Sequence, residues 1–99
     1  MSDKIYTIDE IRRIVQPIAK NFGVEHVYLF GSYARGEADR SSDIDLRIDN
    51  GNVKGLFALA GLINSFSDAL GKEVDVITTS GLDAEFLNRI GQEEVLLYA

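Results

Sequence analysis

The segment from residue 43 to residue 49, DIDLRID, is the feature that most constrains the fold. Charged and apolar residues alternate through it without interruption. Successive side chains of a β-strand point to opposite faces of a sheet, so the alternation predicts a strand with one buried and one polar face. The buried face would carry Ile44, Leu46 and Ile48, and the polar face Asp43, Asp45, Arg47 and Asp49.

The chain before this strand predicts one helix and one further strand. Residues 7–23 have helical periodicity, Thr7 and Glu10 have the spacing of a capping box, and Gly23 is a suitable left-handed stop. Residues 24–30 are rich in β-branched and aromatic residues, which predicts a strand that ends at a Gly-Ser pair.

The rest of the chain predicts a polar connection, two helices and a third strand. Residues 32–42 are expected to form a turn or short helix and a polar loop, and residues 72–79 a strand with Asp75 on its polar face. A short helix is expected from about Asp83, followed by an apolar tail at 95–98. Residues 53–71 predict a long helix with one apolar face, made of Leu56, Leu59, Ala60, Ile63 and Phe66.

Together these elements predict an α/β (α+β) fold of two layers, a small mixed sheet with helices packed against it. The 99 residues are enough for one domain, residues 1–99, and an apolar content of 45% fits a globular core. The chain has no cysteine, which excludes disulfides and thiolate zinc sites. It has no apolar run long enough for a secretory signal or a membrane span, so we expect a cytoplasmic location.

The formal net charge of −6 argues against direct binding to nucleic acid, where basic groups supply most of the affinity. It fits a partner with a basic surface, or carboxylates that hold metal ions. Asp43 and Asp45, two residues apart on one strand, would place their carboxylates on one face about 7 Å apart at the backbone. Asp75 could add a third carboxylate, as a metal ligand or as a general base.

These residue types fit the transfer of a nucleotidyl or phosphoryl group. Two magnesium ions bridged by carboxylates would supply most of that chemistry. Gly31 would leave room for a phosphate, and Ser32 would offer it a hydroxyl and an amide. Arg35 either adds charge to the phosphates or is an ordinary surface residue.

Each feature also has a purely structural interpretation. A Gly-Ser pair after a strand is commonly a turn, and an Asp-x-Asp pair is commonly a solvated face, with Arg47 offsetting its charge. Three carboxylates on one face repel each other, however, and a structural interpretation has to explain them. The remaining polar residues are expected to be structural or solvated: a structural or exposed His26, a packed Tyr33, and a solvated helix face at Gln92, Glu93 and Glu94.

Taken with its spacing, the segment GSYARGEADRSSDIDL resembles the G-S-x10-D-x-D signature of the polymerase-β-like nucleotidyltransferases, and most closely the minimal nucleotidyltransferase (MNT) family. The resemblance extends over nearly the whole chain, including EVDVIT and EEVLLYA. It implies a fold built around ATP and magnesium, with Asp43, Asp45 and Asp75 holding two metal ions and Gly31 and Ser32 holding the triphosphate. Arg47 departs from the apolar residue typical of relatives and could pair with an aspartate.

The resemblance also implies a function. MNT proteins are typically paired with a HEPN-domain toxin, often an RNase, and act as antitoxins that transfer AMP from ATP to a tyrosine of the toxin. One alternative is an antitoxin that occludes the toxin without catalysis. Another is a transferase acting on a small molecule with a separate substrate-binding subunit. Because 99 residues are used up by a catalytic core, the acceptor site is expected on another chain.

Overall fold

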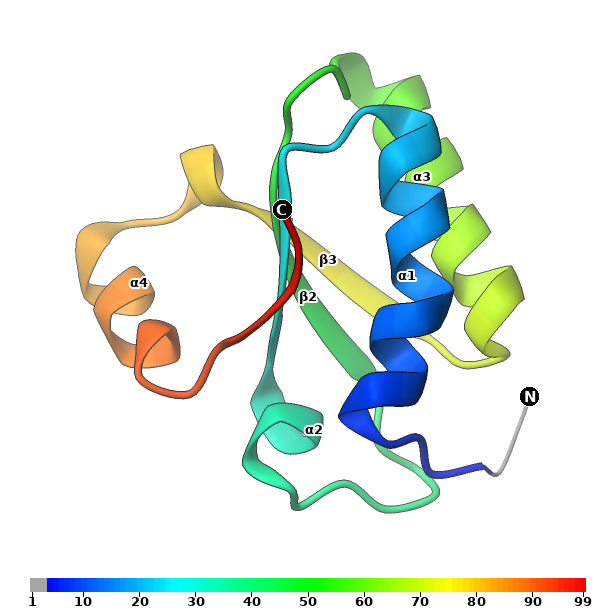
Figure 1. The fold of residues 1–99 in the computed structure, drawn as a ribbon. Helices are drawn as coiled ribbons and strands as arrows, with labels where there is room; N and C mark the ends of the chain where they lie inside the picture. The colour runs from blue at the N-terminus through cyan, green and yellow to red at the C-terminus, as the bar shows by residue number, and fades with distance from the viewer. Residues whose placement is uncertain (1–3) are drawn as a thin grey trace.

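The computed structural model describes residues 4–99, and Figure 1 shows how the helices and strands of this part are arranged. The elements in chain order are α1 (Ile8–Phe22), β1 (His26–Phe30), α2 (Gly31–Arg35), β2 (Ile44–Asp49), α3 (Gly55–Leu70), β3 (Val74–Thr78), the 3-10 turn η1 (Thr79–Gly81), α4 (Ala84–Gly91) and β4 (Val95–Tyr98).

Helix α1 begins and ends where its sequence predicts. The Thr7 hydroxyl accepts a hydrogen bond from the backbone N–H of Glu10 at 3.1 Å, and the Glu10 carboxylate accepts one from the N–H of Thr7 at 2.9 Å. Gly23 closes the helix with a φ of 75° in the left-handed region. These caps satisfy backbone groups that the helix itself leaves unpaired.

The four strands form one mixed sheet in the order β3-β2-β1-β4. Strand β1 is antiparallel to both of its neighbours, whereas β2 and β3 are parallel and are joined by α3. A parallel pair requires such a crossover, because the chain must return to the same end of the sheet. The predicted fold class, a small mixed sheet with helices packed against it, is confirmed.

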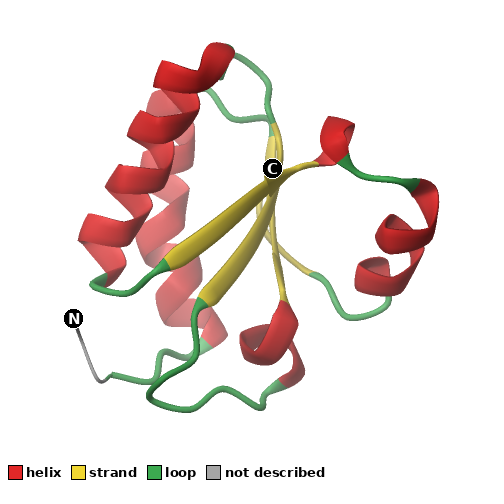
Figure 2. Cartoon of the chain, turned by 180° about the vertical axis from the view of Figure 1, so that it is seen from behind, coloured by secondary structure: helices red, strands yellow, loops and turns green. Residues whose placement is uncertain are grey.

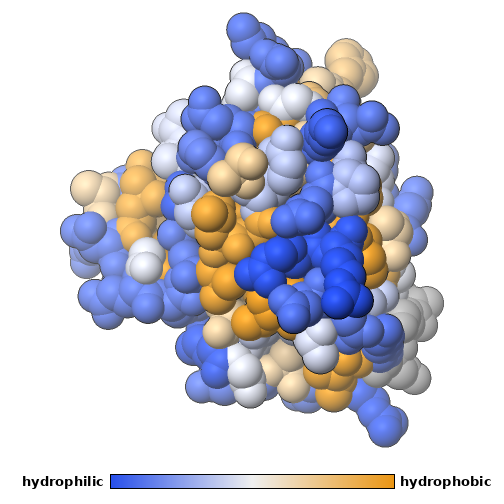
Figure 3. Space-filling view, viewed as in Figure 1, coloured by the Kyte–Doolittle hydropathy of each residue, from blue (hydrophilic) through white to orange (hydrophobic). Residues whose placement is uncertain are grey.

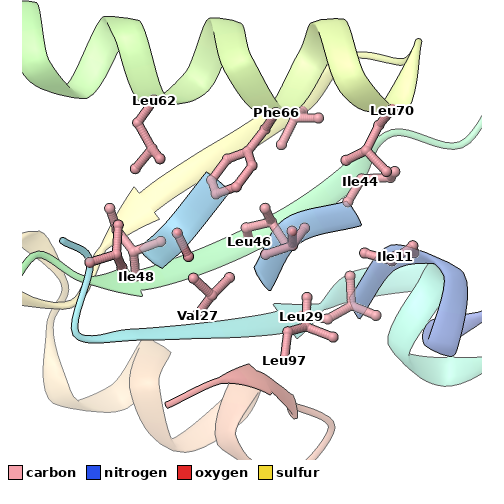
Figure 4. Close-up of a cluster of buried hydrophobic side chains, with 14 of the residues drawn as sticks. Ile11, Val27, Leu29, Ile44, Leu46, Ile48, Leu62, Phe66, Leu70 and Leu97 are labelled. Atoms are coloured by element: carbon pink, nitrogen blue, oxygen red, sulfur yellow. The ribbon is translucent and has the colours of Figure 1, made fainter. Parts of the chain in front are cut away.

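Helices α1 and α3 lie together on one face of the sheet, and α4 lies on the other side (Figures 1 and 2). Apolar side chains of α1 and α3 meet the inward residues of the strands in one buried cluster (Figure 4). Its fully buried members include Ile11, Val27, Leu29, Ile44, Leu46, Ile48, Leu62, Phe66 and Leu70. The predicted inward face of β2 is therefore confirmed, and the polar face of β2 lies on the side of the sheet away from α1 and α3.

The predicted buried face of the long helix is partly wrong. Phe66 is fully buried, but Leu56 is 83% exposed and Ala60 is exposed, whereas Leu62 and Leu70 are buried. Apolar residues surround the first half of this helix, so periodicity there fits more than one face. Contact with the sheet selects the face that carries Leu62, Phe66 and Leu70.

The apolar tail is also more ordered than its sequence predicts. Residues 95–98 form β4, which pairs with β1 and places Leu97 in the core. A four-residue strand carries too few residues for a clear alternation, and its partner lies far back along the chain. Pairing with β1 gives β4 its conformation.

The surface seen from the side of Figure 1 is mostly hydrophilic, with separate apolar patches between charged groups (Figure 3). Within residues 4–99, no helix has both the length and the apolar character needed to cross a membrane.

Candidate active site

The Gly-Ser pair lies where β1 passes directly into α2. Gly31 has a φ of +75°, a conformation that glycine adopts without a steric penalty. A Cβ atom at this position would overlap the Asp45 carboxylate. Glycine at position 31 therefore serves two needs, the turn into α2 and the close approach of the Asp45 side chain. Ser32 follows in the first turn of the helix.

The carboxylates come together because β2 and β3 are parallel and in register. Asp45 of β2 is paired directly with Asp75 of β3. Paired residues on neighbouring strands point to the same face, with strands about 4.8 Å apart. Asp43 lies two residues before Asp45, just before β2 begins, and is exposed like Asp75.

The charges of these groups act on each other. Burial, followed by the negative charges of Asp75 and Asp43, raises the pKa of Asp45 to about 6, while the positive charge of Arg35 opposes the rise. Asp45 is thus the half-buried centre of a crowded anionic group. A cation among these three carboxylates would relieve the crowding, and hard carboxylate oxygens are the ligands that magnesium prefers. The residues fit a magnesium site.

Glu93 also belongs to the corner where β1 passes into α2, which is formed by Gly31, Ser32 and Asp45. The sequence did not predict this position of Glu93. The backbone N–H of Gly31 donates to the Glu93 carboxylate at 2.6 Å, and Arg35 donates to the same oxygen at 3.1 Å. Arg35 also donates to Glu37 at 3.0 Å. The prediction of a solvated helix face at 92–94 is wrong because α4 ends at Gly91, and the next residues turn back toward the sheet.

Arg47 does not pair with the three aspartates. Its guanidinium donates to both carboxylate oxygens of Glu94, at 2.5 and 2.9 Å, and lies over the Tyr28 ring with the two centres 4.1 Å apart. The hydrogen bond to Glu94 raises the pKa of Arg47 despite burial. Arg47 does form an ion pair with a fourth aspartate, Asp49, at 3.5 Å at the far end of β2, so the expectation that it pairs with an aspartate is confirmed. A charged residue that alternates into a half-buried strand face needs a counter-charge, which is the signal that could have pointed to Glu94.

His26 takes part in a second polar cluster, at the opposite end of β1 from Gly31. His26 Nδ1 lies 2.8 Å from the Asp49 carboxylate and 3.6 Å from Glu25. Thr79 donates to the other oxygen of Asp49. Beside this cluster is an open hollow of about 330 Å³, lined by Glu25, Asp49, Asn50, Thr79 and Ser80. Because Asp49 is already hydrogen-bonded on both oxygens and faces Arg47, this cluster fits a structural role for His26.

A family model and individual related proteins assign this chain to the same family. Residues 12–99 match the family model described as polymerase beta, nucleotidyltransferase. A protein of Methanocaldococcus jannaschii, provisionally assigned as a protein adenylyltransferase, is 41% identical over 89% of this chain and 95% of its own length. The protein adenylyltransferase MntA of Thermococcus cleftensis is 31% identical over 90% of this chain and 94% of its own length.

Solved structures agree with the sequence relatives. The structure of a provisionally assigned minimal nucleotidyltransferase superposes with a TM-score of 0.78 at 28% identity, over 91% of this chain and 95% of that one. A tri-AMPylated HEPN toxin of Shewanella oneidensis in complex with an MNT antitoxin matches with a TM-score of 0.72, over 94% of this chain and 73% of that one. At 17% identity this second likeness concerns the fold alone. The chain therefore belongs to the polymerase-β nucleotidyltransferase family, among its minimal nucleotidyltransferases.

Proposed function

We propose that this protein is an antitoxin that transfers AMP from ATP to a tyrosine of a cognate HEPN-domain toxin. The observation that carries the proposal is the pairing of Asp45 with Asp75 beside Gly31, with Asp43 close enough to act on Asp45. A structural role alone does not explain three mutually repelling carboxylates at a glycine corner. The related protein adenylyltransferases support the donor and the reaction type.

The reaction would form one bond and break one. The tyrosine oxygen attacks the α-phosphorus of ATP, the bond from that phosphorus to the bridging oxygen breaks, and pyrophosphate leaves with the electron pair. The proton of the tyrosine hydroxyl passes to a carboxylate, for which Asp75 is the candidate because it is exposed beside Asp45.

The chain's own residues would hold the donor. Asp43, Asp45 and Asp75 would carry two magnesium ions, which when bound neutralise the triphosphate and stabilise the departing pyrophosphate. Gly31 and Ser32 would hold the triphosphate in the first turn of α2, beside Asp45. With a pKa of about 6, Asp45 is mostly ionised at neutral pH, the form in which it can bind a cation.

A HEPN toxin as partner is supported by the structural neighbours, several of which are toxin–antitoxin complexes. A partner chain would also supply the acceptor site.

The test is transfer of label from ATP. The chain and its toxin partner are purified and incubated with magnesium and ATP labelled at the α-phosphate. Label should appear on the toxin, and toxin RNase activity should fall in parallel. Asp45→Asn should reduce labelling by at least about 100-fold. Such a loss is at or above the largest activity losses seen when a residue that only supports a metal ligand is changed. Asp68→Asn, the same change at an exposed position of α3, is the matched control and should label normally.

Two other outcomes would replace the proposal. Inhibition of the toxin without label, unchanged in Asp45→Asn, would indicate an antitoxin that acts by occlusion. The neighbouring apolar residues Leu56 and Phe57, which are 83% and 97% exposed, offer a contact surface for that mode. Transfer of AMP to a small molecule without the partner would assign the chain to a different class of nucleotidyltransferase.

A further inference from the structure

The Glu93 carboxylate lies on Gly31, one of the two residues at which the proposed function places the triphosphate. One of its oxygens accepts from the Gly31 N–H at 2.6 Å and from Arg35 at 3.1 Å. A backbone N–H has a single hydrogen, so it cannot form a good bond to Glu93 and to a phosphate oxygen at once. Occupation by Glu93 and occupation by phosphate therefore exclude each other at Gly31.

The Glu93 carboxylate is close enough to Asp45 for the charges of the two groups to interact. Its charge is one of those that raise the pKa of the neighbouring Asp45. The contacts with Gly31 and Arg35 offset this repulsion, since hydrogen bonds to a charged acceptor are stronger than neutral ones. Glu93 is thus an anion that already occupies the two donors, as an anionic ligand at this position would.

The backbone at Glu93 is hydrogen-bonded, whereas its side chain is partly exposed. The N–H groups of Glu93 and Glu94 both donate to the Ile90 carbonyl at 3.0 Å. The Glu94 side chain is held by Arg47, with both side chains about one-tenth exposed. The Glu93 side chain is 25% exposed, and Glu93 itself lies before β4, so displacement of the carboxylate would require a change of its side-chain rotamer alone.

We propose that Glu93 is an internal competitor of the nucleotide, which occupies the Gly31–Arg35 donors in the free protein and is displaced when the triphosphate binds. The competitor lowers the affinity for ATP and leaves the corner closed to weaker anions. The proposal rests on the proposed function, because both place the triphosphate at Gly31, and it adds Arg35 as a second group that the phosphates would take over from Glu93.

The test is the affinity for ATP with magnesium, measured by calorimetry on the purified chain. Glu93→Gln removes the charge and keeps the size of the side chain. We expect its Kd for ATP to be about tenfold lower than that of the unmodified chain, a change of about 1.4 kcal/mol. Glu85→Gln, the same change on the exposed side of α4, is the control and should leave Kd unchanged.

A second measurement uses the unmodified chain and does not depend on a variant that folds. The carboxyl carbon resonance of Glu93 should shift when ATP and magnesium are added, because the carboxylate leaves Gly31 and Arg35. An equal or higher Kd in Glu93→Gln, or an unshifted resonance at saturating ATP, would overturn the inference and leave the proposed function in place. Absence of ATP binding by both proteins would overturn the proposed function, and the inference with it.

Discussion

Replacing Asp45 with asparagine should stabilise the free protein at neutral pH while it removes the central candidate metal ligand. Asparagine has the shape of aspartate without its charge. Burial and the charges of Asp75 and Asp43 raise the pKa of Asp45 from 3.8 to about 6, so the ionised form is costly in the folded state. The substitution removes that cost.

The magnitude follows from the size of the shift. A rise of about 2 pKa units corresponds to about 3 kcal/mol at 1.36 kcal/mol per unit. Asp45 is only half-buried, and solvent screening reduces the value to about 1–2 kcal/mol. Because the folded state holds the Asp45 proton more tightly than the unfolded chain, the associated stability is fully present below pH 3.8. It is lost as the pH rises through about 6.

The assay is urea denaturation with a chelator present, followed by circular dichroism at two pH values. The free energy of unfolding of Asp45→Asn should exceed that of the unmodified chain by about 1–2 kcal/mol at pH 7.5, and most of this difference should be absent near pH 4. Magnesium added in excess of the chelator at pH 7.5 should reduce this difference in the free energy of unfolding, because the ion binds the folded unmodified chain more tightly than folded Asp45→Asn. Asp68→Asn, exposed on α3, should stay within about 0.5 kcal/mol of the unmodified chain at both pH values.

The reasoning would be refuted if Asp45→Asn were no more stable than the unmodified chain at pH 7.5, or if its extra stability were the same at both pH values. Either result would mean that burial and the charges of Asp75 and Asp43 do not raise the pKa of Asp45 in solution. The fit of the three carboxylates to a metal site would then lose its electrostatic basis.

Three further substitutions test other contacts. Gly31→Ala should cost at least about 1–2 kcal/mol and lower the melting temperature, because it puts a Cβ on a left-handed residue against the Asp45 carboxylate; an unchanged melting temperature would contradict this. Arg47→Met should lower the free energy of unfolding by about 3–5 kcal/mol in urea denaturation, because Glu94 stays buried without its partner. The double variant with Glu94→Gln should recover much of that free energy, and additive losses in the two single variants would contradict the pairing. Tyr33→Phe should leave the stability unchanged or raise it by up to about 1 kcal/mol, since the buried Tyr33 hydroxyl has no hydrogen-bond partner within residues 4–99; a clear loss would reveal one.

Local signals in the sequence were enough for most of the fold. The Thr7–Glu10 capping box and Gly23 fix the ends of α1, and strict alternation identifies β2 and its buried face. These signals work because each depends on residues a few positions apart. The alternation also places Asp45 on a polar face, but it does not give the register that pairs it with Asp75. That pairing depends on the parallel arrangement created by α3.

The rest depended on contacts between distant parts of the chain. Glu93 and Glu94 look like solvated residues in sequence because acidic runs usually are. Their roles come from β4, which pairs with β1 and brings the preceding turn beside Gly31 and Arg47. An arginine on the half-buried face of β2 was a sequence sign that acids would gather around it, but Asp45 and Asp49 beside it in the sequence left no reason to look for a distant one.

Magnesium and triphosphate should act on Glu93 in opposite directions. The negative charge of Glu93 acts on Asp45, so a cation among the aspartates would relieve the repulsion that opposes Glu93 in its present position. Magnesium alone should therefore leave Glu93 on Gly31. A triphosphate bound at Gly31 would add negative charge, take the same N–H donor and expel the carboxylate. Glu93 would therefore stay on Gly31 in the presence of the free metal ion and leave it only when metal and nucleotide bind together. Only that complex would both neutralise the aspartates and replace the Glu93 carboxylate on the Gly31 N–H.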